Sequence, residues 1–265
     1  MQYIFAVWEK TVRRILRSGK IFLCADFDGT LAPLRPKPVQ AKLSRQRLRL
    51  LRDISRKKNF TVAIISGRSL KDLRRKIGLK GIILAGNHGL EIVRSGRRFV
   101  HPGAKRFTPL FARIAGALKK KIRFFPGAVL EQKGLSLSLH YRIVEKHRLR
   151  RLKQLFLQAA APYLRKGLKF TRGKKVWELR PPLKWDKGRA LLFLHQDLKP
   201  KAGLTIFIGD DLTDEDGFRA VNSLGGISIR VGKSEGSLAK FYLKGTKETE
   251  QFLTRIKALK ADVQD

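Results

Sequence analysis

The fold is decided by the stretch IFLCADFDGTL at residues 21–31, in which an apolar run ends abruptly at two aspartates. Positions 21–25 are all apolar, which is typical of a parallel strand covered on both faces. Gly29 follows the second aspartate and allows the backbone to turn sharply. With Asp26 and Asp28 directly after a buried strand, this stretch predicts an open α/β sheet whose functional residues gather at one edge.

Three further apolar runs have the same sequence pattern. They occupy residues 60–65, 82–85 and 204–208, and each ends at a polar residue or a glycine. Helical spacing predicts helices around 48–54 and 70–77, a helix opened by a capping box of Thr213 and Asp216, and a last helix from about residue 246. The alternation of strands and helices predicts a Rossmann-like α/β core, a parallel sheet flanked by helices.

The middle of the chain has a different pattern. Residues 105–121 and 145–166 have helical spacing, whereas residues 135–141 alternate strictly between apolar and polar types. Strict alternation predicts a strand with one buried and one exposed face. A second short strand at 175–180 ends at two prolines, which favours a hinge. We expect a core made of residues 1–100 and 182–265, interrupted by an α+β insert at 101–181.

Composition excludes several classes of protein. With 265 residues, 43% of them apolar, the chain is long enough to form a large core and is not intrinsically disordered. Cys24 is the only cysteine, which excludes an intramolecular disulfide and a multi-cysteine zinc site. Charged residues interrupt the first twenty positions, and no apolar run approaches the ~18 residues of a membrane span. These features predict a soluble, cytoplasmic protein.

The charge balance is strongly basic, with 59 lysines and arginines, 21 acids and a net charge of +38. Such a balance is compatible with nucleic acid, an anionic membrane or an anionic substrate. The basic residues are spread over nearly every expected helix without a nucleic-acid motif, which favours a generally basic surface. Seven of the 21 acids, however, fall within residues 26–28 and 210–216. In so basic a chain this clustering indicates a cation site.

The two acidic segments have the chemistry of a magnesium centre. Paired carboxylates after a buried strand can hold a hard divalent cation, while one attacks as a nucleophile and the other exchanges a proton. Repulsion among Asp210, Asp211 and Asp214 would destabilise their turn unless a cation neutralises it. The acids after Thr213 would also complement the positive end of the following helix. Asp210 and Asp211 are therefore the preferred site members from pattern alone.

Two further residues fit an anionic ligand. Ser66 lies between an expected strand and an expected helix, where a hydroxyl can bind phosphate oxygens, although an N-cap role explains it equally well. Lys187 lies at the start of an expected helix, where a cation opposes the helix dipole unless it serves an anion.

Taken together, the segments resemble the four motifs of the haloacid dehalogenase superfamily: Asp26-Phe27-Asp28-Gly29-Thr30, Ser66, Lys187, and Gly209-Asp210-Asp211 with Asp214. Other segments are similar to those of the trehalose-6-phosphate phosphatases, namely 65–68, 86–91, 139–142, 178–181, 185–188 and 210–215. The resemblance extends from about residue 21 to about residue 232.

The resemblance implies a Mg²⁺-dependent phosphatase that converts trehalose 6-phosphate to trehalose and phosphate. Asp26 would form an aspartyl-phosphate, and Asp28 would protonate the leaving sugar oxygen and then activate water. Mg²⁺ would bind Asp26, the Asp28 carbonyl and Asp210, with the choice between Asp211 and Asp214 left open. Ser66 and Lys187 would hold the phosphoryl oxygens.

The resemblance also implies that the insert at 101–181 is a cap domain that determines substrate specificity, and it implies which residues bind the substrate. In the core these are Thr30, Gly67, Arg68, Asn87 and His88, and in the cap they are Glu131, Lys133, His140, Arg142 and Glu178. Glu131, Lys133 and Glu178 would contact sugar hydroxyls, with His140 and Arg142 near the boundary between the lobes. The pattern alone equally allows a surface position for His140 and a loop hydrogen-bonding role for His88.

Two alternatives remain at this point. A phosphatase for another sugar phosphate, of the sucrose-phosphate, glucosylglycerol-phosphate or mannosyl-phosphoglycerate type, would share the core, but segments 86–91 and 139–142 favour the trehalose type. A polyanion-binding protein on an inactive core is supported only by the charge, whereas every motif position is filled. We expect a small-molecule substrate, no membrane or nucleic-acid partner, and room for a separate trehalose-6-phosphate synthase as partner.

Overall fold

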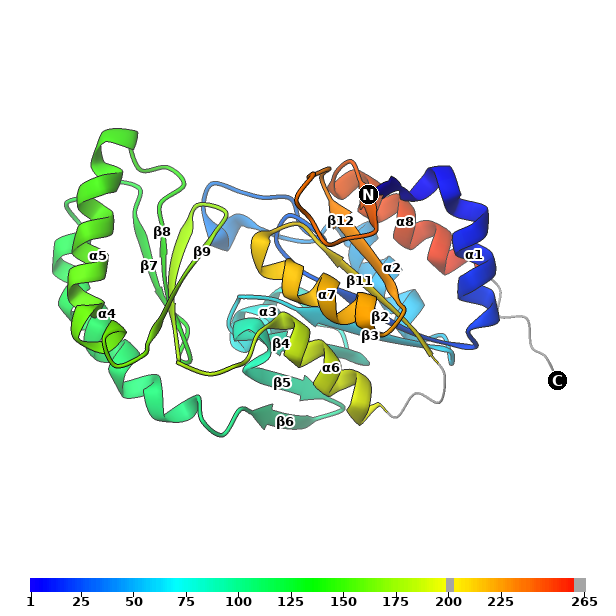
Figure 1. The fold of residues 1–265 in the computed structure, drawn as a ribbon, viewed down its shortest axis with the longest axis horizontal. Coiled ribbons are helices and arrows are strands. Elements are labelled where there is room, and N and C mark those ends of the chain that lie inside the picture. The colour runs from blue at the N-terminus through cyan, green and yellow to red at the C-terminus, as the bar shows by residue number, and fades with distance from the viewer. Residues whose placement is uncertain (199–202, 260–265) are drawn as a thin grey trace. The chain divides into compact units, whose positions relative to one another are not determined.

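The computed structural model describes residues 1–198 and 203–259, and the chain forms two compact units (Figure 1). The first, called here the core unit, comprises Met1–Leu34, Ala41–Phe99 and Trp185–Asp265. The second, called here the inserted unit, comprises Arg35–Gln40 and Val100–Lys184. The inserted unit therefore interrupts the core unit in sequence.

A nine-stranded sheet with the order β1-β13-β12-β11-β2-β3-β4-β5-β6 forms the centre of the core unit. Following this order across the sheet, every neighbouring pair of strands from β1 as far as β4 is parallel. Strand β5 is antiparallel to β4. This arrangement confirms the predicted parallel α/β core. The strands are β1 (Gln2–Tyr3), β2 (Lys20–Ala25), β3 (Phe60–Ile65), β4 (Ile82–Gly86), β5 (Glu91–Arg94), β6 (Arg97–Val100), β11 (Gly203–Gly209), β12 (Ile227–Val231) and β13 (Phe241–Leu243).

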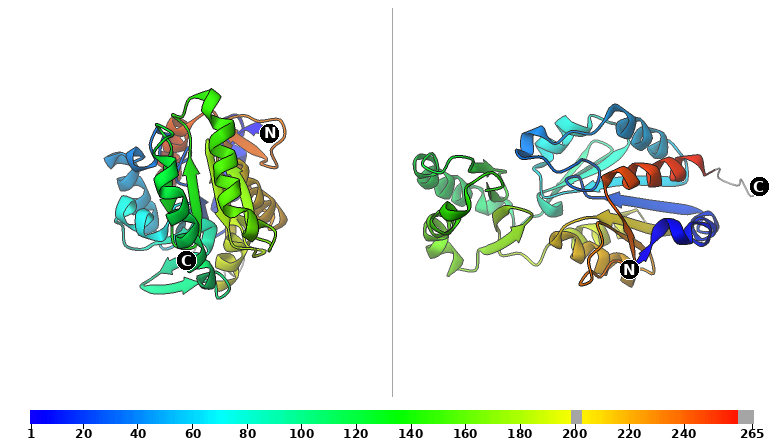
Figure 2. Two further views of the ribbon diagram at one scale, coloured as in Figure 1. Left: turned by 90° about the vertical axis from the view of Figure 1, so that its left-hand side faces the viewer. Right: turned by 90° about the horizontal axis from the view of Figure 1, so that it is seen from above.

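Helices cover both faces of this sheet, as Figure 2 shows for α2 and α7. Residues of α1 (Trp8–Arg17), α2 (Arg45–Ser55), α3 (Leu70–Ile77) and α8 (Thr246–Ala258) share one buried cluster, and those of α6 (Lys187–Asp197) and α7 (Glu215–Ser223) share another. In β2, Ile21 and Leu23 join the first cluster, and Phe22 and Cys24 join the second. Both faces of the strand are therefore buried, which explains its continuous apolar run.

The inserted unit combines an antiparallel sheet of order β7-β8-β10-β9 with two helices. Its elements are β7 (Val129–Gln132), β8 (Leu137–His140), β9 (Lys169–Gly173), β10 (Val176–Arg180), α4 (Thr108–Ile122) and α5 (Leu149–Leu164). Phe111 of α4 and Phe156 of α5 are fully buried together with Leu137, Leu139 and Leu179 of the sheet. Apolar residues from the helices and from the sheet thus form a separate core.

Short 3-10 helices occupy Ile4–Val7, Pro38–Gln40, Asn87–Gly89, Lys105–Phe107, Lys146–Arg148 and Leu212–Asp214. The last of these corrects a prediction, because the capping box is formed by Asp211 and Asp214 rather than by Thr213 and Asp216. The prediction that one face of the strand at 135–141 is exposed is also wrong, because Ser136 and Ser138 are fully buried. Across the two described ranges, no helix is both long enough and apolar enough to cross a membrane.

Candidate active site

The two acidic segments meet because their strands are neighbours. β2 and β11 run parallel, with Ala25 opposite Ile208, and the Asp26 amide donates to the Ile208 carbonyl at 2.8 Å. Each strand ends one residue before its aspartate, so Asp26 and Asp210 leave the same edge of the sheet. Both are buried, with 5% and 2% of their surface exposed.

Asp214 completes a cluster with these two aspartates. One carboxylate oxygen from each of Asp26, Asp210 and Asp214 lies within 4.8 Å of the others. Two glycines make this approach possible, because a Cβ on Gly29 would lie 2.1 Å from Asp210 Oδ2 and a Cβ on Gly209 would lie 2.4 Å from Asp214 Cγ. Gly29 also has a φ of 76°, which other residues rarely adopt.

Lys187 inserts its ammonium group into this cluster. Asp186 caps α6 by accepting from the Arg189 amide, so that Lys187 begins the helix. Its Nζ lies 3.1 Å from Asp26 Oδ1 and 2.7 Å from Asp214 Oδ1, and its side chain is 2% exposed. Burial by itself lowers the pKa of Lys187, but Asp214 and Asp26 outweigh burial and raise it above its usual range. Lys187 therefore stays charged.

The cluster carries more negative than positive charge. Burial raises the pKa of the Asp26 carboxyl well above its usual range; Lys187 opposes the shift, and the neighbouring carboxylates add to it. When all three carboxyl groups are ionised, one ammonium group leaves two negative charges unbalanced, which equals the charge of one divalent cation. Carboxylate oxygens are the donors that Mg²⁺ prefers. The residues present therefore fit such a cation.

Asp28 is held by a buried arginine. Arg68 Nε and Nη2 donate to the two Asp28 oxygens at 2.6 and 2.7 Å, and its Nη1 donates to Asp72 at 2.6 Å. Its guanidinium also lies over the Phe27 ring at 5.1 Å. Burial lowers the pKa of Arg68, but both carboxylates raise it beyond its usual value. Sequence reasoning missed Asp72, although it lies four residues after Arg68, a spacing typical of helical ion pairs.

Asp214 also shapes the turn that carries Asp210. Its Oδ2 accepts the amides of Asp210 and Asp211, both at 2.9 Å. The Asp211 side chain instead accepts the Leu212 amide at 2.8 Å and does not join the cluster of three carboxylates. Thr30 lies on the other side of Asp210 and donates to it at 3.4 Å. The geometry thus places Asp214, rather than Asp211, with Asp26 and Asp210.

The loops after β3 and β4 bring the other predicted core residues together. Ser66 is 2% exposed, and its Oγ accepts the Arg68 amide at 3.3 Å. A Cβ on Gly67 would lie 2.9 Å from the His88 ring, so the two loops are in close contact. Asn87 and His88 both have left-handed backbones, with φ of 48° and 57°.

A residue that was not predicted fixes this left-handed loop. Buried Glu91 accepts the Asn87 side-chain amide and the Leu70 backbone amide, both at 2.8 Å. A left-handed backbone at two non-glycine residues costs free energy, and these hydrogen bonds offset part of that cost.

The inserted unit contains a second polar cluster. Glu131, Ser138 and Glu178 lie opposite one another on β7, β8 and β10. Glu178 Oε1 accepts from Lys133 at 2.9 Å, from Ser136 at 2.9 Å and from Ser138 at 3.0 Å. The two serines are buried because their hydroxyls have this carboxylate as partner. Sequence reasoning missed these two serines. Their short, uncharged side chains in a highly charged chain were a signal that could have indicated buried positions.

Two predicted residues of the inserted unit differ in their surroundings. His140 Nε2 lies 2.8 Å from Glu131 Oε2, so this histidine belongs to the polar cluster, and its side chain is 19% exposed. Arg142 instead donates to the Lys174 carbonyl at an exposed position. No hydrogen bond or ion pair between Arg142 and the polar cluster is present among the described residues.

Solved structures of similar fold define the class of protein. A haloacid dehalogenase-like hydrolase from Bacteroides thetaiotaomicron aligns with a TM-score of 0.62 at 15% identity, covering 89% of this chain and 99% of that one. The C-terminal domain of Candida albicans trehalose-6-phosphate phosphatase aligns with a TM-score of 0.81 at 22% identity, covering 95% and 97%. The chain therefore has the fold of the haloacid dehalogenase-like hydrolases.

Sequence comparisons then give the family. The trehalose-phosphatase family model matches residues 24–247, and the chain is 32% identical over 254 residues to trehalose-phosphate phosphatase B of Arabidopsis thaliana. That alignment covers 91% of this chain and 67% of the plant protein. The chain belongs to the trehalose-phosphatase family and is a phosphatase, a hydrolase of phosphoric monoesters.

Proposed function

We propose that the protein hydrolyses trehalose 6-phosphate to trehalose and phosphate, in a Mg²⁺-dependent reaction through an aspartyl-phosphate. Membership of the trehalose-phosphatase family supports the substrate. The single observation that carries the chemistry is the buried cluster of Asp26, Asp210 and Asp214 around Lys187. Such a cluster offers a nucleophile and a cation site at the same point.

Asp26 acts as the nucleophile. Its carboxylate forms a bond to phosphorus as the bond from phosphorus to the sugar oxygen breaks, and Asp28 gives that oxygen its proton. A water then attacks the phosphorus of the aspartyl-phosphate while Asp28 takes a proton back, which releases phosphate and restores Asp26. Arg68 is a positioning residue in this scheme, because its two hydrogen bonds fix the orientation of Asp28.

The cation would be held by Asp26, Asp210 and the Asp28 backbone carbonyl, with Asp214 adjacent and Asp211 outside the cluster. When bound, Mg²⁺ offsets negative charge on the phosphoryl oxygens. Lys187 and Ser66 bind those oxygens as donors. Lys187 also balances part of the cluster's charge before substrate arrives.

Substrate recognition is divided between the two units. In the core unit, Thr30, Gly67, Arg68, Asn87 and His88 line the phosphate end. In the inserted unit, Glu131, Lys133 and Glu178 bind sugar hydroxyls. His140 orients Glu131, and Arg142, which donates to the Lys174 carbonyl, has the least direct role in binding the sugar. The proposed setting is the cytoplasm, with a separate synthase as the source of the substrate.

The test is phosphate release with Mg²⁺ from a panel of trehalose 6-phosphate, sucrose 6-phosphate and glucose 6-phosphate. The expected result is a strong preference for trehalose 6-phosphate, loss of activity in EDTA, and loss in an Asp26→Asn control. Preference for another sugar phosphate would overturn the substrate. Full activity of the Asp26→Asn enzyme would overturn the mechanism.

A further inference from the structure

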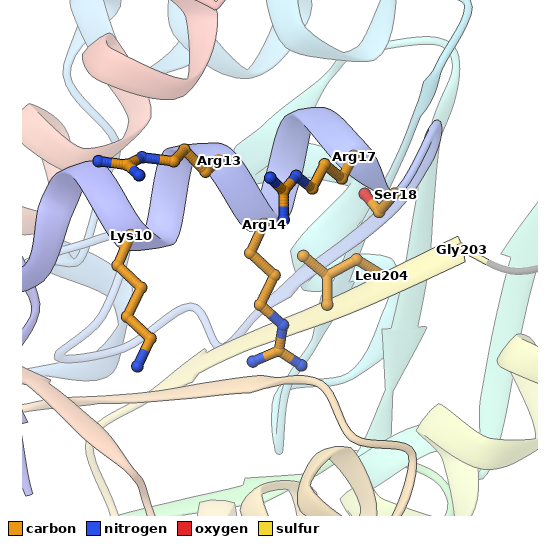
Figure 3. Close-up of a pocket in the computed structure, with 7 residues that line it drawn as sticks. All are labelled: Lys10, Arg13, Arg14, Arg17, Ser18, Gly203 and Leu204. Atoms are coloured by element: carbon orange, nitrogen blue, oxygen red, sulfur yellow. The ribbon is translucent and has the colours of Figure 1, made fainter.

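A basic pocket lies in the core unit (Figure 3). It has a volume of about 700 Å³ and is lined by Lys10, Arg13, Arg14, Arg17, Ser18, Gly203 and Leu204. The lining residues come from α1, from the turn that follows it, and from the first two residues of β11. This volume is within the range of sites that bind small molecules.

The four cations of the pocket have little compensation. Arg13 approaches Glu9 at 3.8 Å, but the two side chains are 73% and 90% exposed, so that this pair is weak. Arg14 donates to the Gly225 carbonyl, which is neutral. Lys10, Arg14 and Arg17 form no ion pair within residues 1–198 and 203–259. The pocket therefore has a net positive charge.

Helix α1 has an unfavourable charge pattern on this face. Positions 10, 13, 14 and 17 are related by steps of three and four residues, which makes like charges neighbours on the helix surface. Lys10 lies in the first turn, where a cation opposes the helix dipole, whereas Arg14 and Arg17 lie in the last turn, where the dipole favours a cation. Figure 3 shows the Lys10 and Arg14 side chains extending from α1 in the same direction, toward the β11 side. An anion between them would relieve this repulsion.

The pocket is also separate from the active site. Gly203 lies opposite Lys20 and Leu204 opposite Ile21, so the pocket is at the amino ends of β11 and β2. Asp26 and Asp210 follow the carboxyl ends of the same strands. A strand of this length separates the two places by roughly 20 Å. A ligand here would not compete with a phosphate held by Lys187.

From this geometry we infer that the α1 pocket binds a small phosphate ester or anhydride carrying at least two negative charges. Three guanidinium groups offer forked donors that match phosphate oxygens. Lys10 and Arg17 are seven residues apart, about 10 Å along the helix, so a chain of phosphates engages both ends better than a single phosphate does. Leu204, which is 7% exposed, contributes a small apolar floor against which a sugar or a base attached to the phosphates can pack. The inference does not depend on the proposed phosphatase reaction.

The test is calorimetric titration of the full chain with pyrophosphate and with ATP, in EDTA and at low salt. A Lys10→Gln/Arg17→Gln variant should weaken binding of both anions on the order of tenfold or more. The matched control is Arg45→Gln/Arg49→Gln on α2, which removes the same charge from exposed positions and should leave binding nearly unchanged. Tighter binding of ATP than of pyrophosphate would show that the Leu204 floor is used, and equal affinity would assign recognition to the phosphates alone.

Equal weakening by the two variants would overturn the inference, because diffuse surface charge would then explain binding. Absence of saturable binding to the wild type would overturn it too. Hydrogen exchange of the wild type provides a measurement without a variant: pyrophosphate should slow exchange in α1 and leave α5 unchanged. Slowing in α5 alone would contradict the assignment. None of these measurements uses phosphatase activity, so their failure would leave the proposed reaction standing.

Discussion

Each unit of the molecule contains a lysine buried against carboxylates, and the two lysines are balanced differently. In the core unit, Lys187 lies within 3.1 Å of Asp26 and Asp214, and Asp210 completes the cluster of three acids. In the inserted unit, Lys133 lies 2.9 Å from Glu178, whose carboxylate also accepts hydrogen bonds from two serine hydroxyls. The first centre sets one ammonium group against three acids, whereas in the second the Glu178 carboxylate is matched by one ammonium group and two hydroxyl donors.

This difference is consistent with different roles for the two units in the proposed reaction. A buried centre with excess negative charge attracts a cation, and with it the phosphate that the cation helps to neutralise. A carboxylate matched by an ammonium group and hydroxyl donors has no such requirement, and these polar groups match the uncharged hydroxyl groups of a sugar. We therefore propose that the core unit performs the chemistry and that the inserted unit recognises the sugar.

The largest expected effect comes from removing each lysine in turn. Lys187→Met leaves buried carboxylates without their cation, so we expect a loss of about 3–5 kcal/mol in the free energy of unfolding and no measurable turnover. Lys133→Met leaves Glu178 with two serine donors, and its cost should be clearly smaller. Thermal unfolding followed by circular dichroism measures both variants. Equal destabilisation would break the comparison between the two centres.

A second experiment uses the acids of the inserted unit. Glu178→Ala removes the acceptor of three hydrogen bonds, so KM for trehalose 6-phosphate should rise roughly 10- to 100-fold, as expected when buried partners are left unpaired. Glu145→Ala is the matched control, because this acid is 62% exposed and pairs with Arg148. Steady-state kinetics should show little change for the control. An unchanged KM in Glu178→Ala would remove Glu178 from sugar recognition.

Charge over the inserted unit provides a third test. This unit has 24 lysines and arginines but three acids. Such a field should steer an anionic sugar phosphate, so kcat/KM should fall several-fold as salt rises from low to physiological levels, while kcat stays nearly constant. A salt-independent kcat/KM would show that the basic surface does not assist substrate capture.

The smallest expected effect concerns Asp26 without metal. Its raised pKa means that the wild type in EDTA loses stability as pH rises through that value, because the buried carboxyl must ionise. Asp26→Asn lacks this titration, so in EDTA its Tm should exceed that of the wild type by a few degrees at neutral pH and by less in mild acid. Mg²⁺ should raise the Tm of the wild type more than that of the variant. A lower Tm for the variant at neutral pH would contradict the picture of unbalanced charge.

The sequence predicted the core best where local pattern and burial agree. The runs that became β2, β3, β4 and β11 are apolar on both faces, so their ends and the residues that follow them were recognisable. The hairpin of β5 and β6 was missed because four of its eight residues are charged, which an edge position in the sheet tolerates. The two-residue β1 and three-residue β13 are too short to produce a pattern.

The site was predictable to the extent that its residues follow strands directly. Asp26, Ser66 and Asp210 do so, whereas the position of Asp214 relative to Asp211 depends on a turn that spacing does not determine. Ser136 and Ser138 were expected to be exposed because alternation does not reveal a buried partner across the sheet. Glu178 is 40 residues or more away in the chain, and the contact arises only from strand pairing.

The central claim, that the core unit performs the chemistry and the inserted unit selects the sugar, is tested most directly with two substrates. The measurement is kcat/KM for trehalose 6-phosphate and for phenyl phosphate, in Ser66→Ala and in Glu178→Gln. The account predicts that Ser66→Ala lowers both values by a similar factor, whereas Glu178→Gln lowers only the value for trehalose 6-phosphate. A parallel loss on both substrates in Glu178→Gln would contradict the account.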